Sequence, residues 1–174
     1  MRSRLKYRLG LLAAATGIAA LVLPGTANAD AQADSYLWHS LAGAHKCVGL
    51  ANNGSTANGT ALVIWDCHGH PDQRWTSGPS GGASAFYSQA GANKCVGLAN
   101  NGSTANGTPL VIWDCHGHPD QQWYASVNNS LRSNAAVNKC IGLANNGSTA
   151  NGTRLVIWDC HGHPDQQWQW QTGL

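Results

Sequence analysis

Residues 46–75 read K-C-V-G-L-A-N-N-G-S-T-A-N-G-T-A-L-V-I-W-D-C-H-G-H-P-D-Q-R-W, and residues 94–123 and 139–168 repeat this stretch almost unchanged. Only three of its 30 positions vary, namely Val48/Val96/Ile141, Ala61/Pro109/Arg154 and Arg74/Gln122/Gln167. A repeat this short cannot bury its own apolar face, so neighbouring repeats must share one core. The sequence therefore predicts a three-fold structure in which any function is built three times.

The first 29 residues have the three parts of an export signal. Basic residues from Arg2 to Arg8 precede an apolar run over residues 9–23, and Ala27 and Ala29 form a small-x-small cleavage site. The run ends at Pro24, short of the roughly 20 residues that span a membrane. We therefore expect residues 1–29 to be a cleavable signal peptide of bacterial type, and residues 30–174 to form a secreted, extracellular domain.

The charge balance changes once this segment is removed. Four of the ten Lys and Arg residues lie in it, so the mature chain keeps six against eight acidic residues, a formal charge of 6 − 8 = −2. The electrostatic case for binding nucleic acid or an anionic membrane then disappears. We expect neither as a partner of the mature chain, and we expect a monomer.

Six cysteines occur two per repeat, always 20 positions apart: Cys47/Cys67, Cys95/Cys115 and Cys140/Cys160. Six cysteines allow 15 pairings, but three-fold repetition selects the one in which each repeat closes its own loop. Such pairs oxidise and persist outside the cytosol. We expect one disulfide per unit, each stabilising the fold by about 3 kcal/mol in the chain-entropy model.

The mature chain is poor in helix signals and rich in strand signals. The β-branched and aromatic run at residues 62–65 follows the dipeptides Asn53-Gly54 and Asn58-Gly59, which suit turns that need positive φ. Each unit carries four such runs, with the segments 77–82 and 125–129 as loops between units. The predicted strands are residues 35–41, 47–50, 62–65 and 75–76 in the first unit, with their counterparts in the other two.

Twelve short strands in three equal units (about residues 35–78, 83–126 and 130–172) predict an all-β fold, a β-trefoil of three pseudo-symmetric four-strand units. A three-bladed propeller is disfavoured because propellers use four or more blades. Strand alternation predicts that Leu62 and Ile64 point inward and that Val63 and Trp65 point outward. The large apolar residues Trp75, Trp123 and Trp168 are expected to meet near the pseudo-three-fold axis.

The pattern C-x-x-L…N-G-T-x-L-V-I-W-D-C-H-G…Q-x-W resembles the ricin-type β-trefoil lectin family, also called carbohydrate-binding module family 13. The resemblance covers essentially the whole mature chain, with Q-x-W motifs at residues 73–75, 121–123 and 166–168. It implies a secreted, non-catalytic carbohydrate-binding protein with up to three similar shallow sites. Galactosides or xylan-like polysaccharides are the expected partners.

The resemblance also implies the site residues. An aromatic residue before the second Cys stacks on a sugar ring, a His follows that Cys, and a polar residue precedes the Gln of Q-x-W. An aromatic platform suits the C–H face of a sugar, and amides and carboxylates suit its hydroxyls. The corresponding residues are Trp65, His68, Asp72 and Gln73; Trp113, His116, Asp120 and Gln121; and Trp158, His161, Asp165 and Gln166.

One departure from the family bears on function. The family commonly has Asp two residues after the first Cys, where this chain has Gly49, Gly97 and Gly142. Loss of a charged acceptor costs roughly 1.5–3 kcal/mol of binding. Asp72 and its counterparts replace the usual Asn, so each site can have kept one carboxylate in another place. The alternative is a sugar-blind scaffold or a protein-binding module.

Several residues also have purely structural interpretations. Trp65 can be an ordinary aromatic of the barrel wall, Gln73 can bond only the backbone, and Asp72 can simply cap a turn. The run Cys67-His68-Gly69-His70 contains zinc ligand types, but a cysteine in a disulfide cannot ligate zinc. We therefore expect no metal and no cofactor. The chain contains no Glu and its Asp positions repeat with the units, so we expect no enzyme activity.

Overall fold

The computed structural model describes residues 35–172, so the predicted signal peptide, residues 1–29, lies outside the described residues. In the described part, no helix has both the length and the apolar character needed to cross a membrane. The first unit contains β1 (Tyr36–Ser40), β2 (Lys46–Leu50), the helical turn α1 (Ala51–Gly54), β3 (Leu62–Asp66), the 3-10 turn η1 (Pro71–Gln73) and β4 (Arg74–Ser80).

The other two units repeat this order. The second contains β5 (Ala83–Ser88), β6 (Lys94–Leu98), α2 (Ala99–Gly102), β7 (Leu110–Asp114), η2 (Pro119–Gln121) and β8 (Trp123–Ala125). A short turn, η3 (Val127–Asn129), leads into the third unit. That unit contains β9 (Leu131–Ser133), β10 (Lys139–Leu143), α3 (Ala144–Gly147), β11 (Leu155–Asp159), η4 (Pro164–Gln166) and β12 (Trp168–Thr172).

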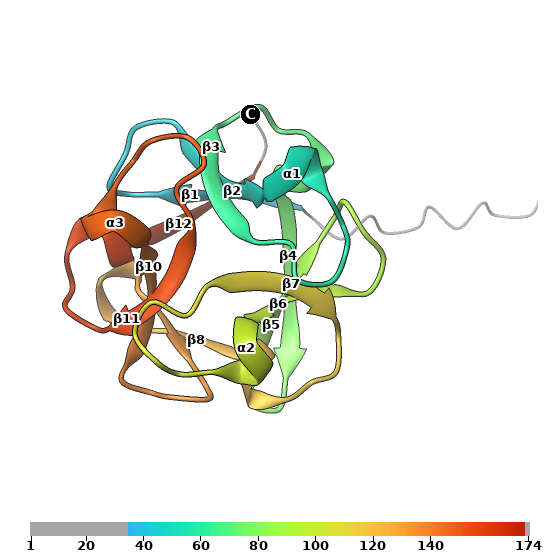
Figure 1. The fold of residues 1–174 in the computed structure, drawn as a ribbon, viewed down its shortest axis with the longest axis vertical. Coiled ribbons are helices and arrows are strands. Elements are labelled where there is room, and N and C mark those ends of the chain that lie inside the picture. Colours follow the sequence, from blue (N-terminus) through green and yellow to red (C-terminus); the bar gives the residue numbers. More distant parts are fainter. Residues whose placement is uncertain (1–34, 173–174) are drawn as a thin grey trace, which may run out of the picture. The chain divides into compact units, whose positions relative to one another are not determined.

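The strands pair as a β-trefoil, which confirms the predicted fold. The outer strands of the units form a barrel wall through the antiparallel pairs β12–β1, β1–β4, β4–β5, β5–β8 and β8–β9. The hairpins β2–β3, β6–β7 and β10–β11 lie around a common centre, one in each of the three lobes that Figure 1 shows. Isolated bridges such as Val63↔Arg154 join each hairpin to the next.

All three predicted disulfides are present, with Cα–Cα distances of 5.0 Å for Cys47–Cys67, 5.1 Å for Cys95–Cys115 and 5.0 Å for Cys140–Cys160. Each bond ties the first strand of a hairpin to the residue just after the second strand. The register explains this geometry, because the first cysteine of each pair lies opposite the tryptophan two residues before the second: Cys47 faces Trp65 across the β2–β3 ladder.

Strand alternation was predicted correctly for three of the four residues of the β3 run. Leu62 and Ile64 are fully buried in the core, and Trp65 is exposed. Val63 was predicted to point outward, and it does lie outside the central core cluster. It is nevertheless only 7% exposed. Val111 and Val156 are 6% exposed although Ala61 and Pro109 bridge to them, so the backbone segment of the neighbouring unit, and not one particular side chain, explains the burial.

The tryptophans of the Q-x-W motifs are buried as expected, and each indole Nε1 donates to a carbonyl oxygen of its own hairpin, as Trp75 does to Val48 at 3.0 Å. They pack through intermediaries that the repeat pattern did not identify. Trp38 of β1 lies 6.1 Å from Trp75 and 5.4 Å from Trp168 between ring centroids. The counterpart of Trp38 in β5 is Phe86, so the core is less symmetric than the repeat.

Of two local predictions, one needs adjustment and one is confirmed. Residues 77–82 were expected to form a loop, but β4 continues to Ser80 and pairs with β5, so only the turn at Gly81 and Gly82 remains. The turn at Asn53-Gly54 requires positive φ as predicted: φ is 55° at Asn53 and 77° at Gly54. This turn closes α1 beside the exposed tryptophan of the same unit.

Candidate functional site

Each unit carries one pocket, bordered by its helical turn, the end of its hairpin and its 3-10 turn. We name the pockets after their tryptophans: the Trp65, Trp113 and Trp158 pockets have volumes of about 470, 390 and 330 Å³. The Trp65 pocket is lined by residues 49–54 together with Val63, Trp65, His68, Asp72, Gly152 and Arg154. Trp, His and Asp were all predicted as site residues, and the structure brings them together in every unit.

The tryptophan of each pocket stands open to solvent. Trp65 is 47% exposed, Trp113 46% and Trp158 47%, whereas the tryptophans of the Q-x-W motifs are at most 3% exposed. Burying so large an aromatic is normally favourable, so three equally exposed indoles are not explained by packing. The interpretation of Trp65 as part of a covered barrel wall does not agree with this exposure.

A neighbouring unit completes each pocket, which the sequence did not indicate. A Cβ atom at Gly152 of the third unit would lie 3.6 Å from Cζ3 of Trp65, so this loop backbone closes against the indole. The second pocket has the same arrangement between Gly59 and Trp113, and the third between Gly107 and Trp158. The glycine of the second Asn-Gly dipeptide thus serves both a turn, with φ of 87° at Gly59, and a close approach.

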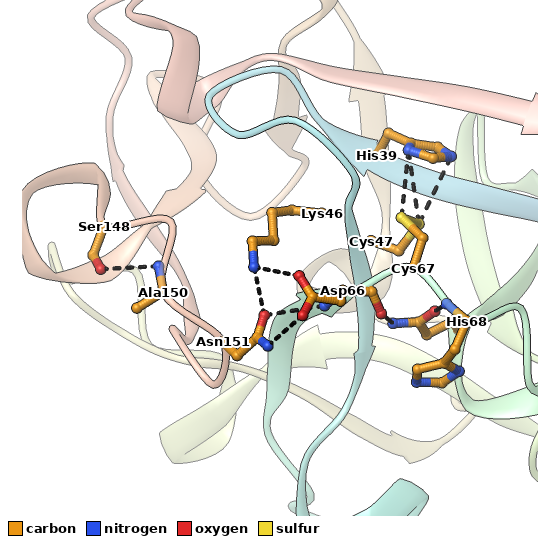
Figure 2. Close-up of polar contacts among 10 residues, drawn as sticks. His39, Lys46, Cys47, Asp66, Cys67, His68, Ser148, Ala150 and Asn151 are labelled. Carbon is orange, nitrogen blue, oxygen red and sulfur yellow. Dashed lines mark hydrogen bonds and ion pairs between the residues drawn. A yellow bond between two sulfur atoms is a disulfide. The ribbon is translucent and has the colours of Figure 1, made fainter.

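A polar clamp holds that neighbouring loop in place. Lys46 Nζ donates to Asp66 Oδ1 and to Asn151 Oδ1, both at 2.6 Å, and Asn151 Nδ2 donates to Asp66 Oδ2 at 2.8 Å. Figure 2 shows Asn151 facing both side chains. Hydrogen bonds from Lys46 and Asn151 hold the pKa of the Asp66 carboxyl below its usual value. The same clamp recurs at Lys94, Asp114 and Asn58, and at Lys139, Asp159 and Asn106.

Asp72 projects from the 3-10 turn that Pro71 begins, and its side chain is 21% exposed. Its Oδ2 lies 3.8 Å from Nε2 of His68, too far for a hydrogen bond. His68 Nδ1 accepts a hydrogen bond from the backbone N–H of His70 at 3.2 Å. The neutral ring therefore carries its proton on Nε2, on the side of Asp72. Donor and acceptor stand side by side without satisfying each other.

The carboxylate of Asp72 occupies the space beside Gly49. A Cβ atom at Gly49 would lie 3.3 Å from Asp72 Oδ2 and 3.0 Å from Gln73 Cγ. At Gly97 and Gly142 the corresponding distances to the carboxylate are 3.5 and 3.6 Å. The place where the family usually has an Asp side chain is thus next to a carboxylate that comes from another segment. This geometry supports the hypothesis of a relocated acid.

Gln73, Gln121 and Gln166 do not line the pockets, although they were predicted as sugar contacts. Gln73 is fully buried: its Oε1 accepts from the backbone N–H groups of His68 at 2.8 Å and Gly69 at 3.3 Å, and its Nε2 donates to the Asp66 carbonyl at 3.1 Å. The oxygen of this amide is fully used and its remaining N–H is buried with the rest of the side chain, so the amide is not accessible to a sugar hydroxyl. It fixes the loop that carries His68, which agrees with the backbone-bonding interpretation.

One cluster in each unit contains metal-ligand types: the ligand atoms of His68, His70 and Asp72 lie within 4.8 Å of one another. A metal on His68 Nε2 needs that nitrogen deprotonated, which transfers the ring proton to Nδ1 and breaks the bond from His70. A further group joins His39 to Cys47 and Cys67, but those sulfur atoms form a disulfide, over which the His39 ring lies in Figure 2.

Comparisons with known proteins agree on the fold. A family model described as "Ricin-type beta-trefoil lectin domain" matches residues 83–173, and one described as "Ricin-type beta-trefoil lectin domain-like" matches residues 40–113. A search of curated proteins found no match. Among solved structures, the chain is similar to the designed three-fold symmetric protein ThreeFoil, with a TM-score of 0.71, 20% identity and coverage of 81% of this chain and 99% of that one.

Two lectin structures are also similar. One is the ricin B-like lectin of Macrolepiota procera in complex with lactose, with a TM-score of 0.66, 20% identity and coverage of 81% of this chain and 96% of that one. The other is the C-half of an earthworm R-type lectin in complex with GalNAc, with a TM-score of 0.64, 14% identity and coverage of 80% of this chain and 99% of that one. At these identities the likeness establishes the fold.

Proposed function

The chain belongs to the ricin-type β-trefoil lectin family, and on that basis we propose that it is a secreted, monomeric, non-catalytic protein that binds carbohydrate in three similar pockets. One observation carries the proposal. In every unit an exposed indole stands beside a histidine donor and a carboxylate acceptor that do not bond each other. Neither packing nor an internal hydrogen bond explains the three groups together.

The chemistry of the pocket suits a sugar ring. The face of Trp65 offers a platform for ring C–H groups. One sugar hydroxyl can accept a hydrogen bond from His68 Nε2 and donate one to Asp72 Oδ2, because the two atoms are 3.8 Å apart. The side chains of Asn52 and Asn53 in the same lining are further donors and acceptors for neighbouring hydroxyls.

Galactosides or xylan-like polysaccharides are the proposed ligands. The structures of two similar lectins hold lactose and GalNAc, both of which contain a galactose-configured ring. An open pocket with few polar contacts binds weakly, with a Kd on the order of 1 mM, equivalent to about 4 kcal/mol. Three such pockets acting on one polymer raise the apparent affinity by roughly 10² without any new contact.

The carboxylates of the pockets favour binding over catalysis. Glycoside hydrolysis by the usual mechanism needs two carboxyl groups roughly 5–10 Å apart across the scissile bond. The residues lining each pocket include a single carboxylate: Asp72, Asp120 or Asp165. This composition supports a binding protein.

The experiment compares retention of the disulfide-intact protein on galactose resin and on insoluble xylan. The combined variant Trp65→Phe, Trp113→Phe and Trp158→Phe keeps a ring in each pocket, whereas the combined Ala variant removes it. We expect the Phe variant to be retained and the Ala variant to elute unbound. If the wild type binds neither support nor any sugar of a glycan array, the chain is instead a sugar-blind scaffold or a protein-binding module.

A further inference from the structure

The three pockets differ in chemistry through one of the three variable positions of the repeat. Val48, Val96 and Ile141 are fully buried in the core. The side chains at the last variable position form equivalent hydrogen bonds: Arg74 Nε, Gln122 Nε2 and Gln167 Nε2 each donate to a glycine carbonyl at 2.8 Å. Only the position occupied by Ala61, Pro109 and Arg154 remains to distinguish the pockets.

This position lies in one unit and contributes to the pocket of the next. Arg154 of the third unit bridges to Val63 and lines the Trp65 pocket. Through the same bridges, Ala61 is the counterpart beside Val111 for the Trp113 pocket, and Pro109 the counterpart beside Val156 for the Trp158 pocket. One pocket therefore gains a guanidinium where the others have a methyl group or a proline ring.

Among the residues that the structure describes, the guanidinium of Arg154 forms no hydrogen bond or ion pair. Within residues 35–172 the aspartates of the ion pairs with lysine bind Lys46, Lys94 and Lys139, and Arg154 accepts a hydrogen bond only at its backbone carbonyl, from Ala144 N–H at 3.0 Å. The residue is exposed. A planar cation with five donors is thus available at the edge of a proposed sugar site.

We propose that the Trp65 pocket prefers sugars that carry an anionic group, such as the carboxylate of a uronic acid, and that Arg154 sets this preference. The inference rests on the proposed function, because it assigns the ligand class of one of the three sites. A guanidinium binds carboxylate or sulfate oxygens through two parallel N–H bonds. Asp72 opposes an anion, but its counterparts Asp120 and Asp165 oppose it equally in the other pockets.

Comparison between pockets therefore isolates the effect of Arg154. The test uses ¹⁵N-labelled, disulfide-intact protein and follows the indole N–H signals of Trp65, Trp113 and Trp158, assigned with single Trp→Phe variants. Titrations with galactose, galacturonic acid and galactose 6-sulfate give a dissociation constant for each sugar in each pocket. The two charged sugars distinguish a carboxylate from a sulfate as the preferred anion.

We expect the acid-to-neutral affinity ratio of the Trp65 pocket to exceed that of the other two by about threefold at low salt, as for an exposed ion pair. The excess should fade toward 1 M salt because the charges are screened. Arg154→Ala should remove the excess and Arg154→Lys should keep part of it. Ala61→Arg should transfer the preference to the Trp113 pocket, which serves as the matched gain-of-function control.

Equal ratios in the three pockets, or a ratio at Trp65 that Arg154→Ala leaves unchanged, would overturn the inference while galactose binding left the proposed function intact. If neither the neutral nor the charged sugars shift any of the three indole signals, the proposed function itself fails.

Discussion

Replacing Gly49 with Asp tests whether Asp72 has taken over the position of the carboxylate usual in the family. The substitution restores the family residue, yet the structure predicts damage. The new Cβ would stand 3.0 Å from Gln73 Cγ and 3.3 Å from Asp72 Oδ2. The pocket would then hold two adjacent carboxylates, and the buried amide below them would have to shift.

The magnitude follows from two contributions. Two carboxylates about 4 Å apart repel by about 1 kcal/mol in bulk water and by about 4 kcal/mol at an effective dielectric constant of 20. Because the Asp72 side chain is 21% exposed, an intermediate value applies, about 2 kcal/mol. Overpacking against Gln73 adds about 1 kcal/mol. For a domain of this size the total lowers Tm by about 8 °C.

The compensating variant is Gly49→Asp combined with Asp72→Asn, which restores the family pattern at both positions. The repulsion disappears, so we expect only the overpacking cost, about 1 kcal/mol or about 3 °C in Tm. Sugar binding in the Trp65 pocket should also recover, because one carboxylate again lies beside the indole. Asp72→Asn alone should weaken binding, since it leaves the pocket without a charged acceptor.

Thermal unfolding of the wild type, the two single variants and the double variant at pH 7 forms a double-mutant cycle. Repeating the cycle near pH 3 adds a second check. Crowding raises the pKa of the paired carboxyls in the folded state, so the cost of Gly49→Asp is present at neutral pH and shrinks as the pH falls and one carboxyl is protonated. Additive effects in the cycle, with a pH-independent cost, would refute the relocation of the acid.

Three further perturbations probe the supports of the pocket. Gln73→Ala leaves buried backbone groups unpaired, so it should lower the free energy of unfolding, measured with denaturant, by about 2–4 kcal/mol. It should also weaken sugar binding at Trp65, although Gln73 does not line the pocket. Unchanged binding would contradict its positioning role. Asn151→Ala removes the clamp between units, so Tm should fall by about 3 °C. The pKa of Asp66 should rise in an NMR titration. If this pKa stays low, Lys46 alone lowers it. The lowered pKa of Asp66, Asp114 and Asp159 stabilises the fold above the unfolded-state value near 4; Tm should fall as the pH drops through the folded-state pKa, and replacing the three by Asn should flatten this profile in calorimetry.

Repetition made most of the fold predictable from the sequence. It selected the cysteine pairing, and strand alternation placed Leu62 and Ile64 inside and Trp65 outside, as the structure shows. The burial of Gln73 could not be predicted from the sequence. Asp72 and Gln73 are adjacent in one 3-10 turn, and only the orientation of this turn places Asp72 in the pocket and Gln73 beneath it.

The sharing of each pocket between two units was not predicted, although a signal existed. Asn58 was attributed to a turn needing positive φ, yet only Gly59 of that dipeptide adopts one. The repeated asparagine is instead explained by its side chain, which bonds Lys94 and Asp114 of the next unit. A turn residue that repeats without a backbone reason therefore indicates a contact between units.

The distribution of the repetition within each unit is itself an argument for function. The residues that line the pockets fall inside the 30-residue repeat, whereas the strands outside it differ even where they are buried: Trp38 of β1 and Leu131 of β9 occupy corresponding core positions. If packing alone required the likeness, the exposed positions inside the repeat would be free to vary. Instead the exposed Trp65, Trp113 and Trp158 are as constant as the buried residues beside them, whereas buried positions of β1, β5 and β9 vary. Three copies of the same tryptophan, histidine and aspartate suit binding to a polymer, because each copy adds to avidity when it engages the same polymer.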